Sequence, residues 1–293
     1  MKVGIFGQSN NETTIKYVRQ LAELCMKNGA SVVFEENFYK SFGQLTKGSK
    51  VSTFSGYKDL DKDLDFFFTV GGDGTFLRSI TFIRDHEIPV IGINTGRLGF
   101  LANIQKESID AAFSKILNGK YTIQKRSLLS VTTENGPDQF DHLNFALNEI
   151  TITRKNTASM IKVDTMLDHE FLTTYWSDGL IVSTPTGSTG YSLSCGGPII
   201  SPTSKNIILT PIAPHSLAVR PLVIPEQTIV ELQIDSRADE VLLTLDSRMY
   251  TLDNKSKLII KKSPFYIKTL QLDDQTFIKT LREKLLWGED KRN

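Results

Sequence analysis

Thr69-Val70-Gly71-Gly72-Asp73-Gly74-Thr75 is the stretch of this chain that decides how its first part folds. The apolar run before it, residues 65–70, predicts a buried strand, and the spacing of the residues after it predicts one face of a helix: Phe76, Leu77, Ile80 and Ile83. Glycines without a Cβ let such a turn approach a ligand closely, and the first amides of the helix suit phosphate. Asp73, the one ionisable side chain on the turn, is expected to accept a proton from a hydroxyl or to touch a metal ion. The alternative is an ordinary glycine turn in which Asp73 caps the helix.

The composition indicates a globular protein without a strongly charged surface. The chain has 293 residues, a net charge of +1, and apolar and charged shares of 40% and 23%. This length allows two domains with cores of their own, and the charge gives no sign of a nucleic-acid or membrane partner. Cys25 and Cys195 lie far apart in the sequence, so no disulfide is expected, and no apolar run approaches a membrane span. We therefore expect a cytoplasmic protein.

Strands and helices alternate over the first 120 residues. Apolar runs at 2–6, 31–34 and 89–93 predict strands, and apolar residues at helical spacing in 15–25 and 109–117 predict helices. This alternation predicts a parallel sheet that binds its ligands at the carboxyl ends of the strands.

Two glycine-bearing loops, 71–75 and 94–99, follow strands of this sheet and are therefore expected at its ligand-binding edge. Residues 40–62 are polar and contain Gly43, Gly48 and Gly56, so they predict a long mobile surface loop that could act as a lid.

After Tyr121 the pattern changes to short runs rich in Val, Ile, Thr and Phe, which predict a β-sandwich. The predicted strands are 128–132, 146–153, 161–166, 179–183, 207–212, 228–234, 241–245 and 257–261. Residues 276–287 are helical in pattern, and this tail is expected to return to the first domain or to form an interface. The predicted fold class is α/β + β: a Rossmann-like α/β domain (1–122), a β-rich dinucleotide-binding domain (123–272) and a helical tail (273–293).

Residues 183–194, Ser-Thr-Pro-Thr-Gly-Ser-Thr-Gly-Tyr-Ser-Leu-Ser, concentrate hydroxyls and glycines after an apolar strand. Hydroxyls both donate and accept hydrogen bonds, so the segment suits a polar ligand such as a nucleotide. The alternative is a hydroxyl-rich loop that caps a helix, although capping requires only one or two such residues.

Asn148-Glu149 stands at the start of a predicted strand. A carboxylate there could accept hydrogen bonds from ribose hydroxyls, and an amide could face an adenine edge. Taken alone, the pair also fits a solvated strand end.

The common nucleotide-binding and metal-binding patterns are missing from the sequence. It contains no Gly-x-Gly-x-x-Gly and no P-loop lysine signature, and its four histidines show no metal-ligand spacing: His86, His142, His169 and His215. Any phosphate that this chain binds is therefore not bound by the usual kinase or dehydrogenase loops.

Together, the 71–75 turn, residues 94–100, Asn148-Glu149, the segment from Asp178 to Ser194 and residues 211–221 resemble the NAD kinase family. The resemblance covers nearly the whole chain. It implies transfer of a phosphoryl group from ATP with Mg²⁺ to the 2′-hydroxyl of the adenosine ribose of NAD, giving NADP, with polyphosphate as a donor for some members. It also implies a homo-oligomer, either a dimer or a tetramer.

The resemblance also implies the site. Asp73 would be the proton acceptor at the 2′-hydroxyl, Asn148 and Glu149 would hold the adenosine end, and Asp178 would lie near the nicotinamide. No protein residue is expected as a metal ligand. The implied NAD- and ATP-binding residues are Gly72, Asp73, Gly74, Arg78, Phe100, Asn148, Glu149, Asp178, Thr184, Thr186, Gly187, Ser188, Thr189, Gly190, Tyr191 and Ser194.

Three positions depart from the pattern of that family. Gly190 stands where alanine is usual, Asp246-Ser247 stands where Asp-Gly is usual, and Trp176 stands where a polar side chain is frequent. These departures put the contacts of Asp246-Ser247 and of Trp176 in doubt.

Two other functions share parts of these features. A lipid kinase of the diacylglycerol kinase type would use the same glycine turn, but it should also show an apolar groove or a basic membrane-facing patch, and neither is evident in the sequence. A non-catalytic NAD(P)-binding sensor would have the same binding residues, so only an activity measurement separates it from a kinase.

Overall fold

The computed structural model describes residues 1–8, 12–42, 51–134, 140, 142–155 and 159–286. The chain divides into two compact units, which are named here unit 1 (residues 1–125 and 267–293) and unit 2 (residues 126–266). Residues 267–272, which the sequence analysis grouped with the β-rich part, belong to unit 1.

Unit 1 is an α/β structure built on a parallel sheet. Its strands are β1 (Lys2–Gly7), β2 (Ser31–Glu35), β3 (Ser52–Phe54), β4 (Phe66–Gly71), β5 (Val90–Asn94) and β6 (Ile104–Gln105). Its helices are α1 (Glu12–Lys27), α2 (Glu36–Phe42), α3 (Asp73–Ile83), α4 (Ile109–Leu117) and α6 (Phe277–Leu285), with 3-10 turns at Arg84–His86 and Lys106–Ser108. The order of the main strands is β5-β4-β1-β2-β3, with every pair parallel, as the alternating pattern predicts.

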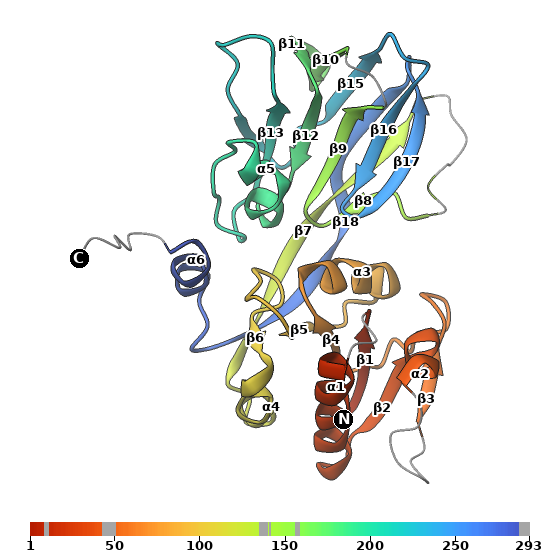
Figure 1. Ribbon diagram of the computed structural model, residues 1–293, viewed down its shortest axis with the longest axis vertical. Coiled ribbons are helices and arrows are strands. Elements are labelled where there is room, and N and C mark those ends of the chain that lie inside the picture. The colour runs from red at the N-terminus through yellow and green to blue at the C-terminus, as the bar shows by residue number, and fades with distance from the viewer. Residues whose placement is uncertain (9–11, 43–50, 135–139, 141, 156–158, 287–293) are drawn as a thin grey trace, which may run out of the picture. The chain divides into compact units, whose positions relative to one another are not determined.

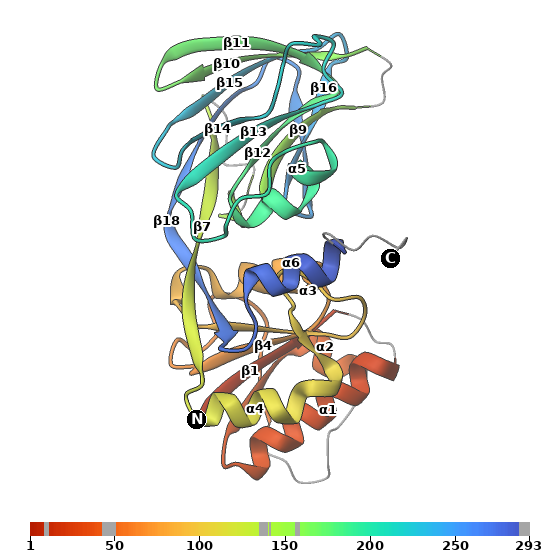
Figure 2. The same cartoon turned by 90° about the vertical axis from the view of Figure 1, so that its left-hand side faces the viewer.

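Helices cover both faces of this sheet. Figure 2 shows α1 and α4 on one face and α3 on the other. The helices bury the residues that the spacing predicts: Val18, Leu21, Ala22 and Cys25 on α1, and Phe76, Ile80 and Ile83 on α3. The strands between them are almost wholly apolar because a parallel sheet covered on both faces has no solvent side.

The predicted loop at 40–62 is wrong in part. Residues up to 42 complete α2, and Ser52–Phe54 form β3, which pairs in parallel with β2. Phe54 and Leu60 are only 1% and 3% exposed, so this segment contributes to the core. Phe54 and Leu60 are two isolated apolar residues in a polar stretch, and two such residues do not produce the periodic pattern that predicts a strand or a helix. Residues 43–50 lie outside the described part of the chain.

Unit 2 is a sandwich of antiparallel sheets (Figure 1). One sheet has the order β14-β13-β12-β9-β16-β17, and the other includes β11-β10-β15-β18 with β7 and β8. The bounds are β7 (Tyr121–Thr133), β8 (Phe145–Ala146), β9 (Glu149–Arg154), β10 (Ile161–Leu167), β11 (Glu170–Ser177), β12 (Gly179–Ser183), β13 (Asn206–Ile212), β14 (Leu222–Pro225), β15 (Val230–Asp235), β16 (Glu240–Leu245), β17 (Arg248–Asp253) and β18 (Lys257–Leu272), with a 3-10 turn at Thr186–Thr189 and α5 at Tyr191–Ser194.

The core of unit 2 lies between the inner faces of its sheets. Ile150 and Ile152 of β9 pack in it together with Val163 of β10 and Leu232 of β15, all fully or almost fully buried. The predicted sandwich is therefore confirmed. The strands β11, β14 and β17 are not among the predicted ones, because their outward residues interrupt the apolar pattern, and β18 extends to residue 272 and not only to the predicted 261.

The C-terminal segment returns to unit 1. The end of β18 pairs in parallel with β5 through Thr269 and Val90, and α6 follows. Cys25 is buried and Cys195 is partly buried, and both are free thiols. No described helix combines the length and the apolar composition that a membrane crossing requires.

Candidate active site

The carboxylate of Asp73 is held by three consecutive backbone amides. Its Oδ2 accepts from Phe100 N at 2.9 Å, and its Oδ1 accepts from Leu101 N at 3.1 Å and Ala102 N at 2.9 Å. Asp73 is the first residue of α3, but Gly72 is the N-cap and no side chain caps this helix. The capping alternative is therefore wrong, because Asp73 connects the α3 turn to another loop instead of closing its own helix.

The pairing of β4 with β5 brings these two loops together. Gly71 at the end of β4 lies opposite Asn94 at the end of β5, so the loops that follow start at the same edge of the sheet. Asn94 is buried, and its Nδ2 donates to Ala102 O at 3.2 Å while its Oδ1 accepts from Gly96 N at 2.7 Å. These bonds fix the loop whose amides hold Asp73.

Gly99 makes room for the carboxylate. A Cβ at this position would lie 1.9 Å from Asp73 Oδ1, so no other residue fits while Asp73 keeps its amide bonds. In the turn itself, a Cβ on Gly71 would lie 2.2 Å from Thr75 Oγ1, whereas Gly72 and Gly74 have no atom within 4 Å of such a Cβ. The backbone at Gly72 and Gly74 is thus open on the side where a Cβ would stand.

One further side chain of unit 1 contacts Asp73, and another lies on the same helix α3. The Nζ of Lys284, on α6, lies 3.7 Å from Asp73 Oδ2, a contact that sequence reasoning missed because nothing in the local pattern links the tail to the turn. Arg78 is exposed and lines a cavity of about 160 Å³ with Gln8 and Asn37, which follow the carboxyl ends of β1 and β2.

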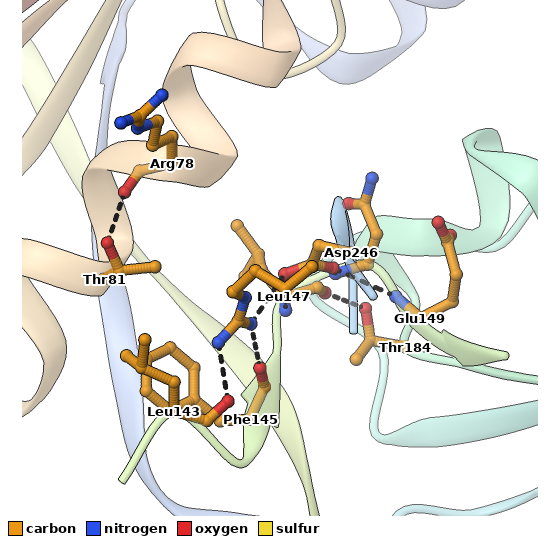
Figure 3. A network of polar contacts seen from close by, with 10 residues as sticks. Arg78, Thr81, Leu143, Phe145, Leu147, Glu149, Thr184 and Asp246 are labelled. Carbon is orange, nitrogen blue, oxygen red and sulfur yellow. Dashed lines mark hydrogen bonds and ion pairs between the residues drawn. The ribbon is translucent and has the colours of Figure 1, made fainter. Parts of the chain in front are cut away.

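In unit 2, Asp246 fixes the backbone of Asn148-Glu149. It occupies the turn between β16 and β17 with φ of +54°, and its side chain is almost fully buried. Its carboxylate accepts from the amides of Leu147, Asn148 and Glu149 at 2.9, 2.7 and 3.3 Å (Figure 3). The doubt about contacts at Asp246-Ser247 is thereby removed for Asp246, which acts within the protein on the predicted ligand-binding pair.

Asn148 and Glu149 each present a buried oxygen without a partner. No hydrogen-bond partner for Asn148 Oδ1 or Glu149 Oε2 exists within the described residues. Burial, with a smaller contribution from the charge of Asp246, raises the pKa of Glu149 to about 8, against an opposing hydrogen bond from the Tyr191 amide. Buried acceptors of this kind are costly unless something donates to them, so the pair is suited to ligand hydroxyls or amino groups.

Part of the hydroxyl-rich segment, residues 183–194, forms hydrogen bonds with the backbone next to the Asn148-Glu149 pair. Thr184 donates from its N to Asn148 O at 2.9 Å and from its Oγ1 to Leu147 O at 2.5 Å, and it accepts from Gly187 N at 3.1 Å. A Cβ on Gly187 would lie 2.1 Å from Asn148 O. These two residues therefore seat the loop on the backbone of the Asn148-Glu149 pair.

Among the remaining residues of the segment, some hydroxyls are hydrogen-bonded within the protein and other side chains are exposed to solvent. Ser188 Oγ bonds to the backbone of Ile200, and Thr189 Oγ1 donates to Thr186 O at 3.3 Å. Tyr191 is 44% exposed, and Ser194 is exposed as well. The outer end of the segment is therefore the part that a ligand could reach.

Gly190 has a clear steric consequence. A Cβ at this position would lie 2.8 Å from Glu149 Oε2, so the glycine leaves that carboxylate more room than alanine would. The departure from the family pattern at residue 190 thus falls directly beside Glu149.

Asp178 is paired with a cation of its own sheet. It forms a two-point contact with Arg154, at 3.0 Å from Nε and 3.2 Å from a terminal guanidinium nitrogen. Trp176, two residues earlier, is 49% exposed, and the Nζ of Lys162 lies 4.6 Å from its ring centre. At this position, where a polar side chain is frequent in the family, the chain thus has an aromatic ring two residues before Asp178. Lys162 covers one face of that ring.

Within the described residues, no three His, Cys, Asp or Glu side chains gather as metal ligands. Asp73 has three of its acceptor positions filled by amides. The part of the chain that the structure describes therefore offers single carboxylates such as Asp73 and no cluster of three such side chains.

Comparisons with known proteins agree across the whole chain. Residues 3–121 match the family ATP-NAD kinase N-terminal domain, and residues 147–272 match the ATP-NAD kinase C-terminal domain. The NAD kinase of Christiangramia forsetii is 50% identical over 296 residues, covering 100% of both chains.

Two solved structures share the fold. A yeast NADH kinase in complex with NADH has a TM-score of 0.87 at 25% identity, covering 99% of this chain and 89% of that one. An NAD kinase from Archaeoglobus fulgidus in complex with ATP has a TM-score of 0.77 at 25% identity, covering 98% and 100%.

Proposed function

Because this chain belongs to the NAD kinase family and phosphorylates NAD to NADP with ATP, we propose that the transfer takes place at the Asp73 turn, with the 2′-hydroxyl of the adenosine ribose as acceptor. The observation that carries this proposal is the carboxylate of Asp73, held by three amides beside the open backbone of Gly72 and Gly74. Phosphoryl transfer depends mainly on positioning and charge stabilisation, and this turn offers both.

In the proposed reaction, the 2′-oxygen forms a bond to the γ-phosphorus of ATP while the bond to the β,γ-bridging oxygen breaks. ADP leaves, and Asp73 takes the proton of the 2′-hydroxyl. The amides of residues 100–102 hold the carboxylate in one orientation, so no reorganisation is required when the hydroxyl arrives.

The adenosine end of NAD is assigned to Asn148 and Glu149. The buried Oε2 of Glu149 accepts from a ribose hydroxyl, and the Oδ1 of Asn148 accepts from the amino group of adenine, which satisfies both unpartnered oxygens. Asp246, through the amides of residues 147–149, is the positioning residue for this pair. Tyr191 and Ser194 contact the same nucleotide from the outer end of their segment, and Asp178 lies toward the nicotinamide.

We propose that Mg²⁺ enters as part of the substrate MgATP, coordinated by the phosphates. Arg78 and the first amides of α3 are the protein groups assigned to the donor phosphates, because a helix N-terminus favours anions. We also propose a cytoplasmic homo-oligomer, either a dimer or a tetramer.

The decisive experiment is incubation of the protein with NAD, ATP and Mg²⁺, followed by detection of NADP with an NADP-specific dehydrogenase. We expect NADP to accumulate, to be absent when ATP is omitted, and to form far more slowly when Asp73 is changed to asparagine. Binding of NAD without any NADP would instead support the sensor alternative. Phosphorylation of diacylglycerol in place of NAD would support the lipid kinase alternative, which the match of both halves of the chain to NAD kinase domains disfavours.

A further inference from the structure

The last turn of α6 carries a lysine to the carboxylate of Asp73. Lys284 Nζ lies 3.7 Å from Asp73 Oδ2 and 4.7 Å from the centre of the Phe100 ring. The Lys284 side chain is one-third exposed, at 34%. This cation therefore sits at the group assigned above as the proton acceptor.

The position of Lys284 follows from the way α6 is held within unit 1. Thr276 caps the helix by accepting from Lys279 N at 3.1 Å, and Thr280 is buried. The ring of Phe277 packs against Phe100 with a centroid distance of 6.3 Å. Just before the helix, Asp274 pairs with Lys115 of α4 at 2.7 Å. The helix is thus fastened at its start and along one side.

The contact between Lys284 and Asp73 is an ion pair but not a hydrogen bond. At 3.7 Å the separation exceeds the usual 2.7–3.2 Å of N–H···O bonds. The three N–H donors of the ammonium are therefore not used by Asp73, and Lys284 makes no other hydrogen bond among the described residues. An ammonium with free donors, held in place by a ring and a carboxylate, is ready to bind an anion.

Transfer at Asp73 brings two negatively charged groups together, and the positive charge of Lys284 reduces their repulsion. The γ-phosphoryl group must approach the attacking hydroxyl, and hence a carboxylate of the same sign of charge. The glycine turn has no lysine or arginine before Arg78. Within the described residues, Lys284 is the one whose cationic nitrogen lies within 4.0 Å of the Asp73 carboxylate.

We propose that Lys284 is a further catalytic residue of the NAD kinase reaction, supplied by the C-terminal helix. Its ammonium donates to the equatorial oxygens of the γ-phosphoryl group during transfer, the role that a lysine or an arginine fills in other phosphoryl-transfer enzymes. The inference rests on the proposed function, since it requires the transfer to occur at Asp73.

Steady-state kinetics of two variants test the proposal. Lys284→Met keeps the length of the stem and removes the charge, so kcat should fall about 10²-fold, as for loss of one transition-state donor. The KM for NAD should stay within about threefold, since Lys284 acts on the donor phosphoryl and not on the dinucleotide. Lys284→Arg should recover at least about a tenth of the wild-type kcat, because it restores the cation.

A matched control comes from the same helix. Arg282 is exposed and makes no hydrogen bond or ion pair among the described residues, so Arg282→Met removes one positive charge from α6 and leaves the contact between Lys284 and Asp73 in place. Its kcat should stay within about twofold of wild type. The melting temperatures of all variants should lie within a few degrees of wild type, as for exposed substitutions.

Binding of a transition-state mimic separates a chemical role from a merely structural one. In calorimetry with NAD present, Lys284→Met should weaken binding of MgADP with aluminium fluoride by about the factor lost in kcat, and should leave MgADP alone within about threefold. Equal weakening of both, or equal loss of kcat in the Met and Arg variants, would mean a structural contact and overturn the proposal.

The remaining outcomes are also decisive. If wild type makes NADP and Lys284→Met does so at the same rate, the role of Lys284 is refuted and the proposed function stands. If wild type makes no NADP, the proposed function fails and this inference fails with it.

Discussion

Two aspartates of this protein, Asp73 and Asp246, form the same pattern of hydrogen bonds with the backbone. Asp73 in unit 1 and Asp246 in unit 2 each accept hydrogen bonds from three consecutive backbone amides, those of residues 100–102 and of residues 147–149. Such bonds hold a carboxylate in one orientation and hold the donating loop in place. The Asp73 side chain stays 29% exposed, whereas the Asp246 side chain is almost wholly buried and fixes the backbone of Asn148-Glu149.

Asp73→Asn should lower kcat by about 10²–10⁴, because the amide cannot accept a proton. Binding of NAD, measured by calorimetry, should change little. The NH₂ end of the asparagine amide would face a backbone N–H donor. We therefore also expect the free energy of unfolding to fall by about 1–3 kcal/mol, and the melting temperature to fall with it. Turnover per folded molecule at the wild-type rate would show that Asp73 has only the structural role.

Asp246→Asn should act on dinucleotide binding. One backbone amide would lose its acceptor next to Asn148-Glu149, at a cost of about 1–3 kcal/mol, so the KM for NAD should rise on the order of tenfold. The KM for ATP should change less, because the variant leaves Asp73 and Arg78 intact. An unchanged KM for NAD in a folded variant would remove Asp246 from the positioning role.

Glu149 gives a pH dependence with a definite sign. Its pKa is raised from 4.5 to about 8 in the folded protein, mainly by burial. Between these values the folded protein holds a proton that the unfolded chain has released, so the free energy of unfolding should fall as pH rises through this window and level off above about 8. The pKa of Asp246 is also raised by burial, which adds to the same trend.

The measurement is urea unfolding of the ligand-free protein from about pH 5 to about pH 9, on wild type and Glu149→Gln. Glutamine does not titrate, so its slope should be shallower over the window. Identical slopes for the two proteins would show that Glu149 ionises normally.

At the scale of helices and strands, two features bring the site residues together: the pairing of strands in the sheets, and the C-terminal segment that returns to unit 1. The loops after β4 and β5 start side by side through the pairing of Gly71 with Asn94, and Gly99 leaves the space that Asp73 fills. The helix α6 then packs on Phe100 through Phe277, which lies 177 residues further along the chain. In unit 2, the turn at Asp246 reaches Asn148-Glu149 because β16 pairs with β9.

Thr276→Ala should loosen α6 without unfolding the protein. The lost N-cap costs helices about 0.5–2 kcal/mol, and α6 buries only Thr280 among its described residues. Hydrogen exchange should quicken in residues 277–285, and kcat should fall severalfold because Lys284 spends less time near Asp73. The global melting temperature should move little. Faster exchange without any loss of kcat would argue against a part for α6 in catalysis.

The molecule as a whole consists of two units with separate cores. Gly72, Asp73, Gly74, Arg78 and Phe100 belong to unit 1, and the other predicted site residues belong to unit 2. Both units leave large apolar side chains exposed, among them Phe171, Trp176 and Leu217 in unit 2 and Ile278 in unit 1. Exposed apolar side chains are frequent on isolated subunits of oligomers.

Assembly into a dimer or a tetramer is therefore expected in solution. Multi-angle light scattering at micromolar protein should give a mass of at least two subunits, against 32.8 kDa for one chain. A matched run at high salt checks that the association is not merely ionic, since apolar contacts persist under screening. A monomer with full activity would contradict this prediction.

Local patterns in the sequence determined much of this protein. The alternation of apolar runs predicted the parallel sheet of unit 1, the change of pattern near Tyr121 predicted the sandwich, and the glycine turn with Asp73 was recognised as the start of a helix. Those features depend on spacing between near neighbours, which the sequence displays directly. The strand β3 was missed because its burial rests on the single anchor Phe54 and no periodicity marks it.

Only the tertiary structure decided what each side chain touches. The amides that hold Asp73, the lysine beside it and the aspartate that fixes Asn148-Glu149 all lie between 27 and 211 residues from their partners. The sequence showed most of these residues but not their pairing, because hydrogen bonds and ion pairs across such separations depend on sheet register and on where the chain returns. Side-chain chemistry is written locally, whereas the geometry that makes it useful arises only when distant segments pack together.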